Sequence, residues 1–225
     1  QVRLLLRRLL SALVFLHSHH IVHRDIKVRG RQAGPENILI LEEGVMHSGK
    51  LGDFGFATRL DPQHHTRTTP PAASASASAS ATTTTAVGTP EYVAPEVLLQ
   101  QPFDGKADVW SAGVTAFCLL SGTMPFRGLT LDTLYTAVLD GACSYAGAEW
   151  GRVSDRAQDL VRRMLVVDPG ERWTARQLLQ HPWLVDGGAG PGAGAGFAVT
   201  RLGLGRRARV RLKSVALAVV FLNRL

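Results

Sequence analysis

The sequence predicts a mainly α-helical fold with a small β-hairpin region, and three observations carry this prediction. Apolar residues recur at three- and four-residue spacing over residues 1–18, as on the buried face of a helix. Residues 107–120 are almost wholly apolar, which predicts a central helix buried on all sides. The segments with strand-like composition are all short. A chain of 225 residues with 45% hydrophobic content can bury one good core.

The start of the chain predicts one helix and a small hairpin. The helix covers residues 1–18, and no capping signal precedes it, which suggests that a further segment lies upstream of Gln1. The apolar pair Ile21-Val22 follows. Residues 37–41 and 50–52 flank a Glu-Glu-Gly turn region, so we expect them to pair as short strands.

The second half of the chain predicts a helix-rich core. The buried helix of residues 106–122 is expected to end at Gly122. Ser154 and Thr174 are typical N-terminal caps and mark the starts of two later helices. The further helices are expected at residues 130–140, 154–166 and 174–180.

Three segments have a composition that differs from the rest of the chain. Residues from about 61 to 85 are mostly Ser, Ala, Thr, Pro and His, which predicts a disordered insertion within a loop. Residues 185–205 are rich in Gly and Ala and predict a flexible linker. Residues 206–225 combine a basic first half with regularly spaced apolar residues, which predicts a basic amphipathic helix.

The net charge of +7 is due to the C-terminal residues that follow Asp186. The last acidic residue is Asp186, and the seven Lys and Arg residues beyond it account for the whole excess. This distribution favours a local partner over a domain that coats nucleic acid. No apolar run approaches the ~20 residues that span a bilayer, and residues 1–16 lack the pattern of a signal peptide. Cys118 and Cys143 show neither a disulfide framework nor metal-ligand spacing, which favours an intracellular protein with two reduced thiols.

Three short motifs near the start of the chain have the composition of a phosphoryl-transfer site. They are His23-Arg24-Asp25-Ile26-Lys27, Pro35-Glu36-Asn37-Ile38-Leu39 and Asp53-Phe54-Gly55. Transfer of a phosphoryl group to a hydroxyl needs a carboxylate that accepts the hydroxyl proton, and Asp25 can supply it. Lys27 can hold the phosphoryl group by its charge. Asn37 and Asp53 offer the hard oxygen ligands that Mg²⁺ prefers.

Further motifs follow in order along the chain. They are Gly88-Thr89-Pro90-Glu91-Tyr92 with Ala94-Pro95-Glu96, Asp108-Val109-Trp110-Ser111-Ala112-Gly113, Leu120-Ser121-Gly122 with Pro125-Phe126, and Asp168-Pro169 with Arg172 and His181-Pro182-Trp183. Together with the first three motifs, this series resembles the C-terminal lobe of a protein serine/threonine kinase over roughly residues 1–184. The resemblance implies a partial protein kinase domain, in which a mainly α lobe carries a small β-hairpin region near the catalytic loop.

The resemblance implies a role for the residues of these motifs. Asp25 would be the catalytic base, Lys27 would contact the phosphoryl group and mark specificity for Ser or Thr, and Asn37 and Asp53 would bind magnesium. ATP with Mg²⁺ would be the cofactor, with Mn²⁺ as an alternative metal. Thr89 would line the acceptor hydroxyl of a protein substrate.

Other matched residues would adjust regulation and substrate choice. Arg24 would pair with a phosphate on the activation loop, for which Thr85 matches the usual position and residues 82–84 are alternatives. Thr85 would equally suit a solvated low-complexity tract. Glu36 would favour a basic residue near the acceptor, or would be a solvated loop charge.

The remaining matched residues would hold the site together. Glu96 and Arg172 would form a buried ion pair, and Asp108 would brace the catalytic loop from the central helix. Packing and turn roles would fall to His23, Phe54 and Gly55.

Within the kinases, residues 92–98, 107–113 and 150–161 are most similar to the calcium/calmodulin-regulated group, and plant-type calcium-dependent kinases are the nearest subgroup. The resemblance implies that residues 206–225 are an autoinhibitory segment that binds calmodulin or an EF-hand domain. A basic amphipathic helix on any acidic surface is the alternative. The chain contains no calcium-loop pattern of its own.

The sequence departs from the family pattern at three places. The Gly-rich loop, strand lysine and helix glutamate of the N-terminal lobe have no counterpart, so we expect the chain alone to bind ATP poorly and to be inactive. Residues 28–34 insert seven positions between Asp25 and Asn37, where a misplacement of about 1 Å can cost roughly a hundredfold in rate. They are either translated splice-site sequence or a bulge that leaves both residues in place. The insertion at about 61–85 is expected to leave the chemistry intact, since each doubling of loop length costs only ~0.6 kcal/mol.

The sequence therefore favours a fragment of an ATP-dependent protein serine/threonine kinase, which transfers the γ-phosphoryl group to Ser or Thr of protein substrates. The alternative is a catalytically impaired kinase-like scaffold or calmodulin-binding protein, whose catalytic loop is split by residues 28–34. Retention of Asp25, Lys27, Asn37 and Asp53 favours the enzyme. We expect a cytoplasmic location, with the nucleus as an alternative, and neither a nucleic-acid partner nor a transmembrane segment.

Overall fold

The computed structural model describes residues 1–27, 37–39, 49–60 and 89–186. Several predicted features lie outside these ranges: the insertions 28–34 and about 61–85, nearly all of the linker 185–205, the segment 206–225, and the residues Glu36 and Thr85. At the linker boundary, Val185 still belongs to helix α7 (Pro182–Val185).

Helix α1 (Val2–Ser18) presents one apolar face to the core, as the spacing predicts. Six leucines of this face are buried: Leu5, Leu6, Leu9, Leu10, Leu13 and Leu16. The opposite face carries Arg7, Arg8 and Ser11, which are exposed. The buried stripe packs α1 against the rest of the fold, so the first predicted helix is confirmed.

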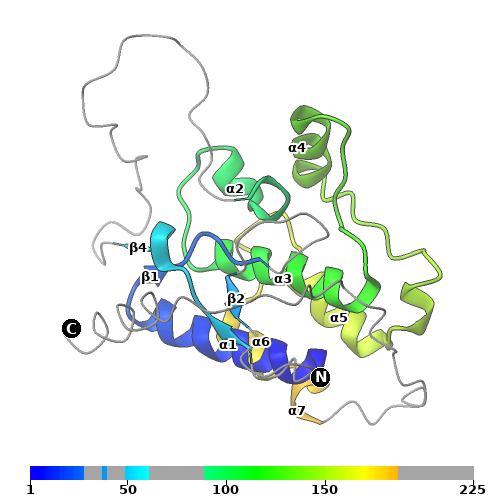
Figure 1. Ribbon diagram of the computed structural model, residues 1–225, viewed down its shortest axis with the longest axis horizontal. Helices are drawn as coiled ribbons and strands as arrows, with labels where there is room; N and C mark the ends of the chain where they lie inside the picture. Colours follow the sequence, from blue (N-terminus) through cyan, green and yellow to red (C-terminus); the bar gives the residue numbers. More distant parts are fainter. Residues whose placement is uncertain (28–36, 40–48, 61–88, 187–225) are drawn as a thin grey trace.

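Helix α3 (Lys106–Ser121) is the predicted central helix, and twelve of its residues are buried. It ends at Gly122, as predicted. Gly113 lets helix α5 (Asp155–Met164) approach closely, because a Cβ atom at Gly113 would lie 2.8 Å from the Cβ of Met164. Figure 1 shows α3 between α1 on one side and helices α2 (Pro95–Leu98) and α4 (Leu131–Leu139) on the other.

The other predicted helices are confirmed to within two residues at each end. They correspond to α4, α5 and α6 (Ala175–Leu179). The side chain of Ser154 accepts a hydrogen bond from the first turn of α5, and Thr174 forms a capping box with Gln177 at the start of α6. Helix α7 was not expected; it begins at Pro182, and the side chain of His181 caps it. No helix in the described part of the chain is long and apolar enough to cross a membrane.

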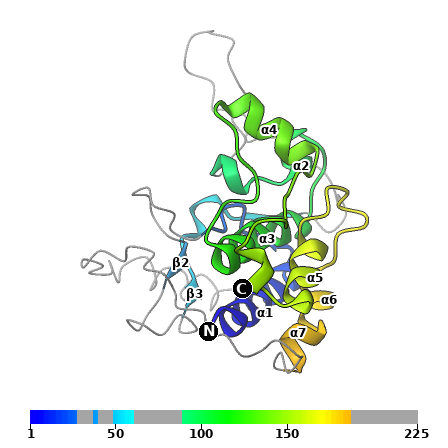
Figure 2. The same cartoon turned by 90° about the vertical axis from the view of Figure 1, so that its right-hand side faces the viewer.

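Two small antiparallel sheets complete the fold. Strand β2 (Ile38–Leu39) pairs with β3 (Lys50–Leu51), with Ile38 opposite Leu51, which confirms the predicted hairpin. Strand β1 (Ile21–Val22) pairs with β4 (Thr58–Arg59), a partner that the sequence pattern did not indicate. Figure 2 shows β2 and β3 beside α1, away from α4 and α2.

Glu96 and Arg172 form a buried ion pair that joins α2 to the loop between α5 and α6. Two parallel bonds run from the guanidinium to the carboxylate, at 2.7 and 2.9 Å, and both side chains are almost fully buried. The remaining three N–H groups of Arg172 donate to the carbonyl oxygens of Val166, Val167 and Lys106. All five guanidinium donors therefore have acceptors, which a buried charge requires.

The two cysteines are not bonded to each other. Burial raises the pKa of the Cys118 thiol to about 12 and that of the Cys143 thiol to about 11. Both side chains therefore remain thiols near neutral pH and are poor nucleophiles there.

We expect the substitution Glu96→Ala to lower the free energy of unfolding by about 3–5 kcal/mol, because it leaves the Arg172 guanidinium buried without its carboxylate. Urea denaturation followed by circular dichroism measures this change.

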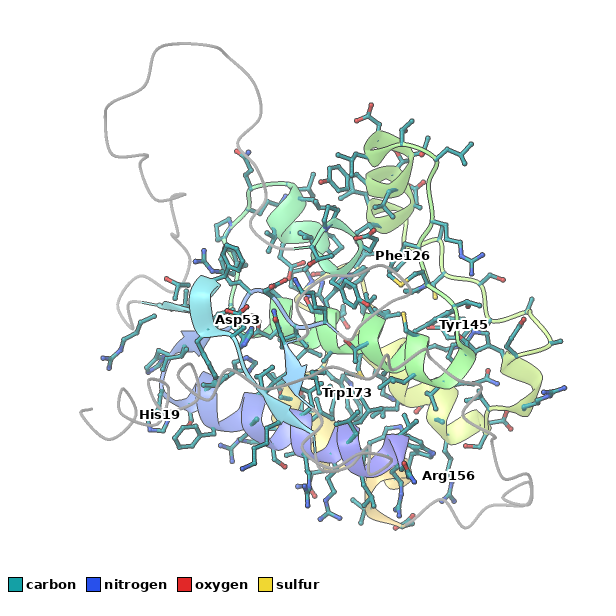
Figure 3. The ribbon with its side chains drawn as sticks, in the orientation of Figure 1. His19, Asp53, Phe126, Tyr145, Arg156 and Trp173 are labelled. Atoms are coloured by element: carbon teal, nitrogen blue, oxygen red, sulfur yellow. The ribbon has the colours of Figure 1, made fainter. Side chains whose placement is uncertain are left out.

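Arg156→Ala is the matched control, because Arg156 forms a more exposed ion pair with Asp186, at 3.4 Å. Figure 3 shows Arg156 at the far end of the fold from Asp53. The control should cost at most about 1 kcal/mol. Equal losses in the two variants would contradict a special role for the buried pair.

Candidate functional site

The carboxylate of Asp108 connects α3 to the loop that follows β1. Asp108 is fully buried, and its Oδ2 atom accepts hydrogen bonds from the backbone N–H of His23 and from Nε2 of His17, both at 2.9 Å. Its Oδ1 atom accepts from the backbone N–H of Arg24 at 2.9 Å. One side chain of the central helix thus fixes two successive peptide groups just before Asp25.

Gly105 makes room for the imidazole of His17 beside the start of α3. A Cβ atom at Gly105 would lie 2.5–2.7 Å from the His17 ring, which is too close for any side chain. The lack of a side chain at this position is therefore what allows His17 to reach Asp108.

Arg24 has a backbone conformation that side chains rarely adopt, with φ of 68°. The two bonds from the backbone N–H groups of His23 and Arg24 to Asp108 hold this residue in place, and its Nε atom donates to the carbonyl oxygen of Phe56 at 2.6 Å. Burial lowers the pKa of the Arg24 guanidinium, and the nearby Asp108 carboxylate acts in the opposite direction. The turn at Arg24 brings the following residue, Asp25, to the centre of the candidate site.

The carboxylate of Asp25 lies at the centre of a cluster of polar side chains and is only 4% exposed. Nζ of Lys27 donates to both carboxylate oxygens, at 2.9 and 3.2 Å. The same ammonium donates to Oγ1 of Thr89 at 2.8 Å, and the Thr89 hydroxyl lies 3.3 Å from Oδ1 of Asp25. A carboxylate, a cation and a hydroxyl from segments 64 residues apart therefore meet at one point.

Asn37 joins this cluster although residues 28–36 separate it from Lys27. Its amide nitrogen donates to the backbone oxygen and to Oδ2 of Asp25, both at 2.5 Å. Asn37 is fully buried, and among the described residues its Oδ1 atom has no hydrogen-bond partner. A buried amide oxygen without a donor is a suitable ligand for a hard cation.

Asp53 lies in the turn after β3, which is tied to the same cluster through the backbone. The N–H of Gly52 donates to the carbonyl oxygen of Asn37 at 2.7 Å, and Nε2 of His23 donates to the carbonyl oxygen of Gly52 at 3.0 Å. Asp53 is exposed and has φ of 55°, and Oδ1 accepts from the N–H of Gly55. Its carboxylate is therefore accessible to a ligand from solvent.

The rings of His23 and Phe54 are in contact beneath this turn, with centroids 4.9 Å apart. His23 also accepts the N–H of Asp25 at Nδ1, at 3.4 Å. Its ring thus links the loop around Asp25 to the turn around Asp53.

The oxygen atoms of this site suit Mg²⁺ better than they suit a softer metal. Among the described residues, no cluster of three or more His, Cys, Asp and Glu side chains could hold a metal ion. The candidate ligands are instead Oδ1 of Asn37 and the carboxylate of Asp53. A small set of oxygen ligands, completed by water and phosphate, is the usual arrangement for Mg²⁺.

Sequence reasoning did not identify two contributors to the site, His17 and the carbonyl oxygen of Phe56. His17 lies four residues after Leu13 on the buried face of α1, so a polar residue on an apolar stripe was the available signal. The backbone contact at Phe56 leaves no signal in side-chain composition. Glu36 and Thr85, which were expected at this site, lie outside the described residues.

Comparison with known proteins gives the same family over most of the chain. The family model of the protein kinase domain matches residues 1–184. Serine/threonine-protein kinase H1 of Homo sapiens is 38% identical over 180 residues, which cover 80% of this chain and 37% of that protein. Serine/threonine-protein kinase DCLK1 of Rattus norvegicus is 39% identical over 187 residues, covering 82% of this chain and 37% of that protein.

A more distant relative is a probable myosin light chain kinase of Dictyostelium discoideum, 33% identical over 183 residues that cover 81% of this chain and 41% of that protein. The chain thus spans about two fifths of the length of the curated relatives it matches. The match to the family model over 184 residues, together with these relatives, shows that the chain belongs to the protein kinase domain family.

Proposed function

We propose that this chain carries the catalytic loop of a protein serine/threonine kinase, which transfers the γ-phosphoryl group of ATP to a Ser or Thr hydroxyl of a protein substrate. The observation that carries the proposal is the convergence of Lys27, Asn37 and Thr89 on the carboxylate of Asp25. The protein kinase family generally uses ATP and Mg²⁺, and the oxygen atoms near Asp25 fit that metal.

Asp25 is the proposed catalytic base. Its carboxylate is buried and held by two donors, so its position relative to an incoming hydroxyl is fixed before the substrate binds. The Thr89 hydroxyl lies beside the same carboxylate and indicates where a substrate hydroxyl would be received. A carboxylate within hydrogen-bond reach of the acceptor can orient the hydroxyl and accept its proton.

Lys27 is proposed to contact the phosphoryl group during transfer. Its ammonium lies between Asp25 and Thr89, at 2.9 Å from Oδ2 of Asp25 and 2.8 Å from Oγ1 of Thr89. A positive charge at this place can neutralise charge on the phosphoryl oxygens at the point where the acceptor is held. The side chain is only partly buried, so it can move the short distance that this contact requires.

Asn37 and Asp53 are proposed as the residues that hold Mg²⁺, through the free Oδ1 atom of Asn37 and the exposed carboxylate of Asp53. Bound Mg²⁺ neutralises phosphate charge. The bonds from Asn37 to Asp25 hold the amide so that its nitrogen faces the base and its oxygen stays available. Because the Asn37 side chain contacts the base and also offers a ligand oxygen, it would fix the position of the metal relative to the Asp25 carboxylate.

We further propose that residues 1–184 are the helical C-terminal lobe of the kinase domain and that the protein belongs to the calcium/calmodulin-dependent-like group. The predominance of helices and the resemblance of residues 92–98 and 107–113 to that group support this. Control by calmodulin or an EF-hand domain through residues 206–225, and an activation-loop phosphate at Thr85 that pairs with Arg24, remain part of the proposal.

The competing function is a kinase-like scaffold without catalysis. It was suggested by the seven residues inserted between Lys27 and Pro35. The contact between Asn37 and Asp25 favours the enzyme, because the inserted segment does not separate these two side chains. An activity assay distinguishes the two functions.

We expect Asp25→Asn in the full-length protein to lower the rate of γ-phosphoryl transfer to a Ser- or Thr-containing protein by about a hundredfold or more, because an amide cannot accept the hydroxyl proton. Incorporation of labelled phosphate from ATP measures the rate. Asp132→Asn is the matched control, since Asp132 is an exposed residue on α4, and it should leave the rate unchanged. A wild-type protein no faster than Asp25→Asn would favour the scaffold.

We expect Asn37→Ala to raise the Mg²⁺ concentration that gives half-maximal activity by about tenfold, because the substitution removes a proposed ligand oxygen. Saturating Mg²⁺ should restore part of the rate of this variant but none of the rate of Asp25→Asn. Titration of activity with Mg²⁺ at constant ATP measures both responses. An unchanged Mg²⁺ requirement in Asn37→Ala would remove Asn37 from the metal site.

A further inference from the structure

A cavity of about 410 Å³ lies where the end of α1, strand β1 and the first turns of α3 and α6 meet. Figure 1 shows α1 and α6 below α3, with β1 near one end of α1. Asp25, Lys27, Asn37, Asp53 and Thr89 of the candidate site do not line this cavity. Its volume is within the range of small-molecule sites, which is roughly 300–1,000 Å³.

The inner wall of the cavity is apolar and belongs to the core. Val22, Val109 and Ala175 line it, and each is at most 1% exposed. Val14 and Ile21, which are partly buried, extend the same wall. Val22, Val109 and Ala175 are packed in the core and hold the wall in place from inside. Val14 and Ile21 are the apolar side chains that remain accessible to an apolar body such as a small ring.

The rim of the cavity is positively charged, and one of its cations is available. The ammonium of Lys106 already donates to the carbonyl oxygens of Pro169 and Gly170, and Asp104 caps the N–H of Lys106. Arg176 on α6 is exposed and has no hydrogen-bond or ion-pair partner in the described part of the chain. Within the described ranges no group competes for the guanidinium of Arg176, which can therefore pair there with an anionic group of a ligand.

The cavity is also lined by His17, which is connected through Asp108 to the loop that contains Asp25. His17 lines the wall and donates to Asp108, which binds the backbone of His23 and Arg24. A ligand in the cavity would therefore contact His17. Occupancy of the cavity would thus restrain the same set of contacts that positions Asp25.

We propose that this cavity binds a small amphipathic monoanion, a carboxylate with an aromatic or short aliphatic body. The apolar part would lie against the partly buried side chains of Val14 and Ile21, and the carboxylate would pair with Arg176. Cations are disfavoured by Arg176 and Lys106. Ligands with several charges are disfavoured by the apolar wall and by the carboxylate of Asp104, because each unpaired charge would lose its hydration.

Titration of the full chain with 4-phenylbutyrate, followed by isothermal calorimetry and by protein NMR, tests the proposal. We expect saturable binding with shifts at Val14, Ile21 and Val22. The uncharged analogue 4-phenylbutan-1-ol should bind about tenfold more weakly, because it lacks the charge that pairs with Arg176. Equal binding of the alcohol, or no saturable binding of the acid, would overturn the proposal.

Arg176→Glu should weaken binding of 4-phenylbutyrate about tenfold, since it removes one ion pair and adds a repulsion. Arg176→Lys should retain most of the affinity, and Arg152→Glu, an equal change of charge at another exposed position, should have no effect. Both Arg176 variants should keep the wild-type melting temperature because the residue is exposed. Equal losses in Arg176→Glu and Arg152→Glu would show only a general effect of charge. Since this titration measures binding, its result does not depend on whether the protein transfers phosphate.

Discussion

The geometry of the candidate site depends on the buried carboxylate of Asp108. Its two oxygens accept from the backbone N–H groups of His23 and Arg24, and through them it fixes the turn that precedes Asp25. Arg24 has a left-handed backbone conformation, which is unfavourable for an arginine in isolation and persists only where surrounding bonds hold it. A charged acceptor on the rigid central helix supplies those bonds. The position of Asp25 is thus determined by contacts with α3 rather than by the structure of its own loop.

Further contacts connect Asp108 and its neighbours to the other segments of the site. Gly105 leaves space for His17, so the end of α1 contributes a third donor to Asp108. His23 in turn binds the carbonyl oxygen of Gly52, which places the Asp53 turn against the loop around Asp25. The buried ion pair of Glu96 and Arg172 anchors α2, which follows Thr89 along the chain. Long-range polar contacts to buried helix residues, rather than local loop structure, assemble the site.

Much of the helical fold and the composition of the site could be predicted from the sequence. The periodicity of residues 1–18 and the apolar run after Lys106 were sufficient for α1 and α3, because burial of an apolar face determines both. The ordered motifs were sufficient to expect Asp25, Lys27, Asn37 and Thr89 in one place. The pairing of β1 with β4 and the reach of His17 to Asp108 were not predictable, because both join segments far apart in sequence through contacts that leave no periodic pattern. Helix α7 was too short to give a periodic signal.

Hydrogen exchange at the backbone amides of His23 and Arg24 tests most directly whether Asp108 holds the turn that precedes Asp25. Asparagine at position 108 offers one carbonyl oxygen and an NH₂ group, so at least one of the two amides loses its acceptor. In Asp108→Asn we expect NMR-detected exchange of these amides to accelerate about tenfold or more relative to wild type, while amides in the middle of α3 stay protected. Unchanged protection of both amides in a folded Asp108→Asn variant would contradict the dependence of the site on this carboxylate.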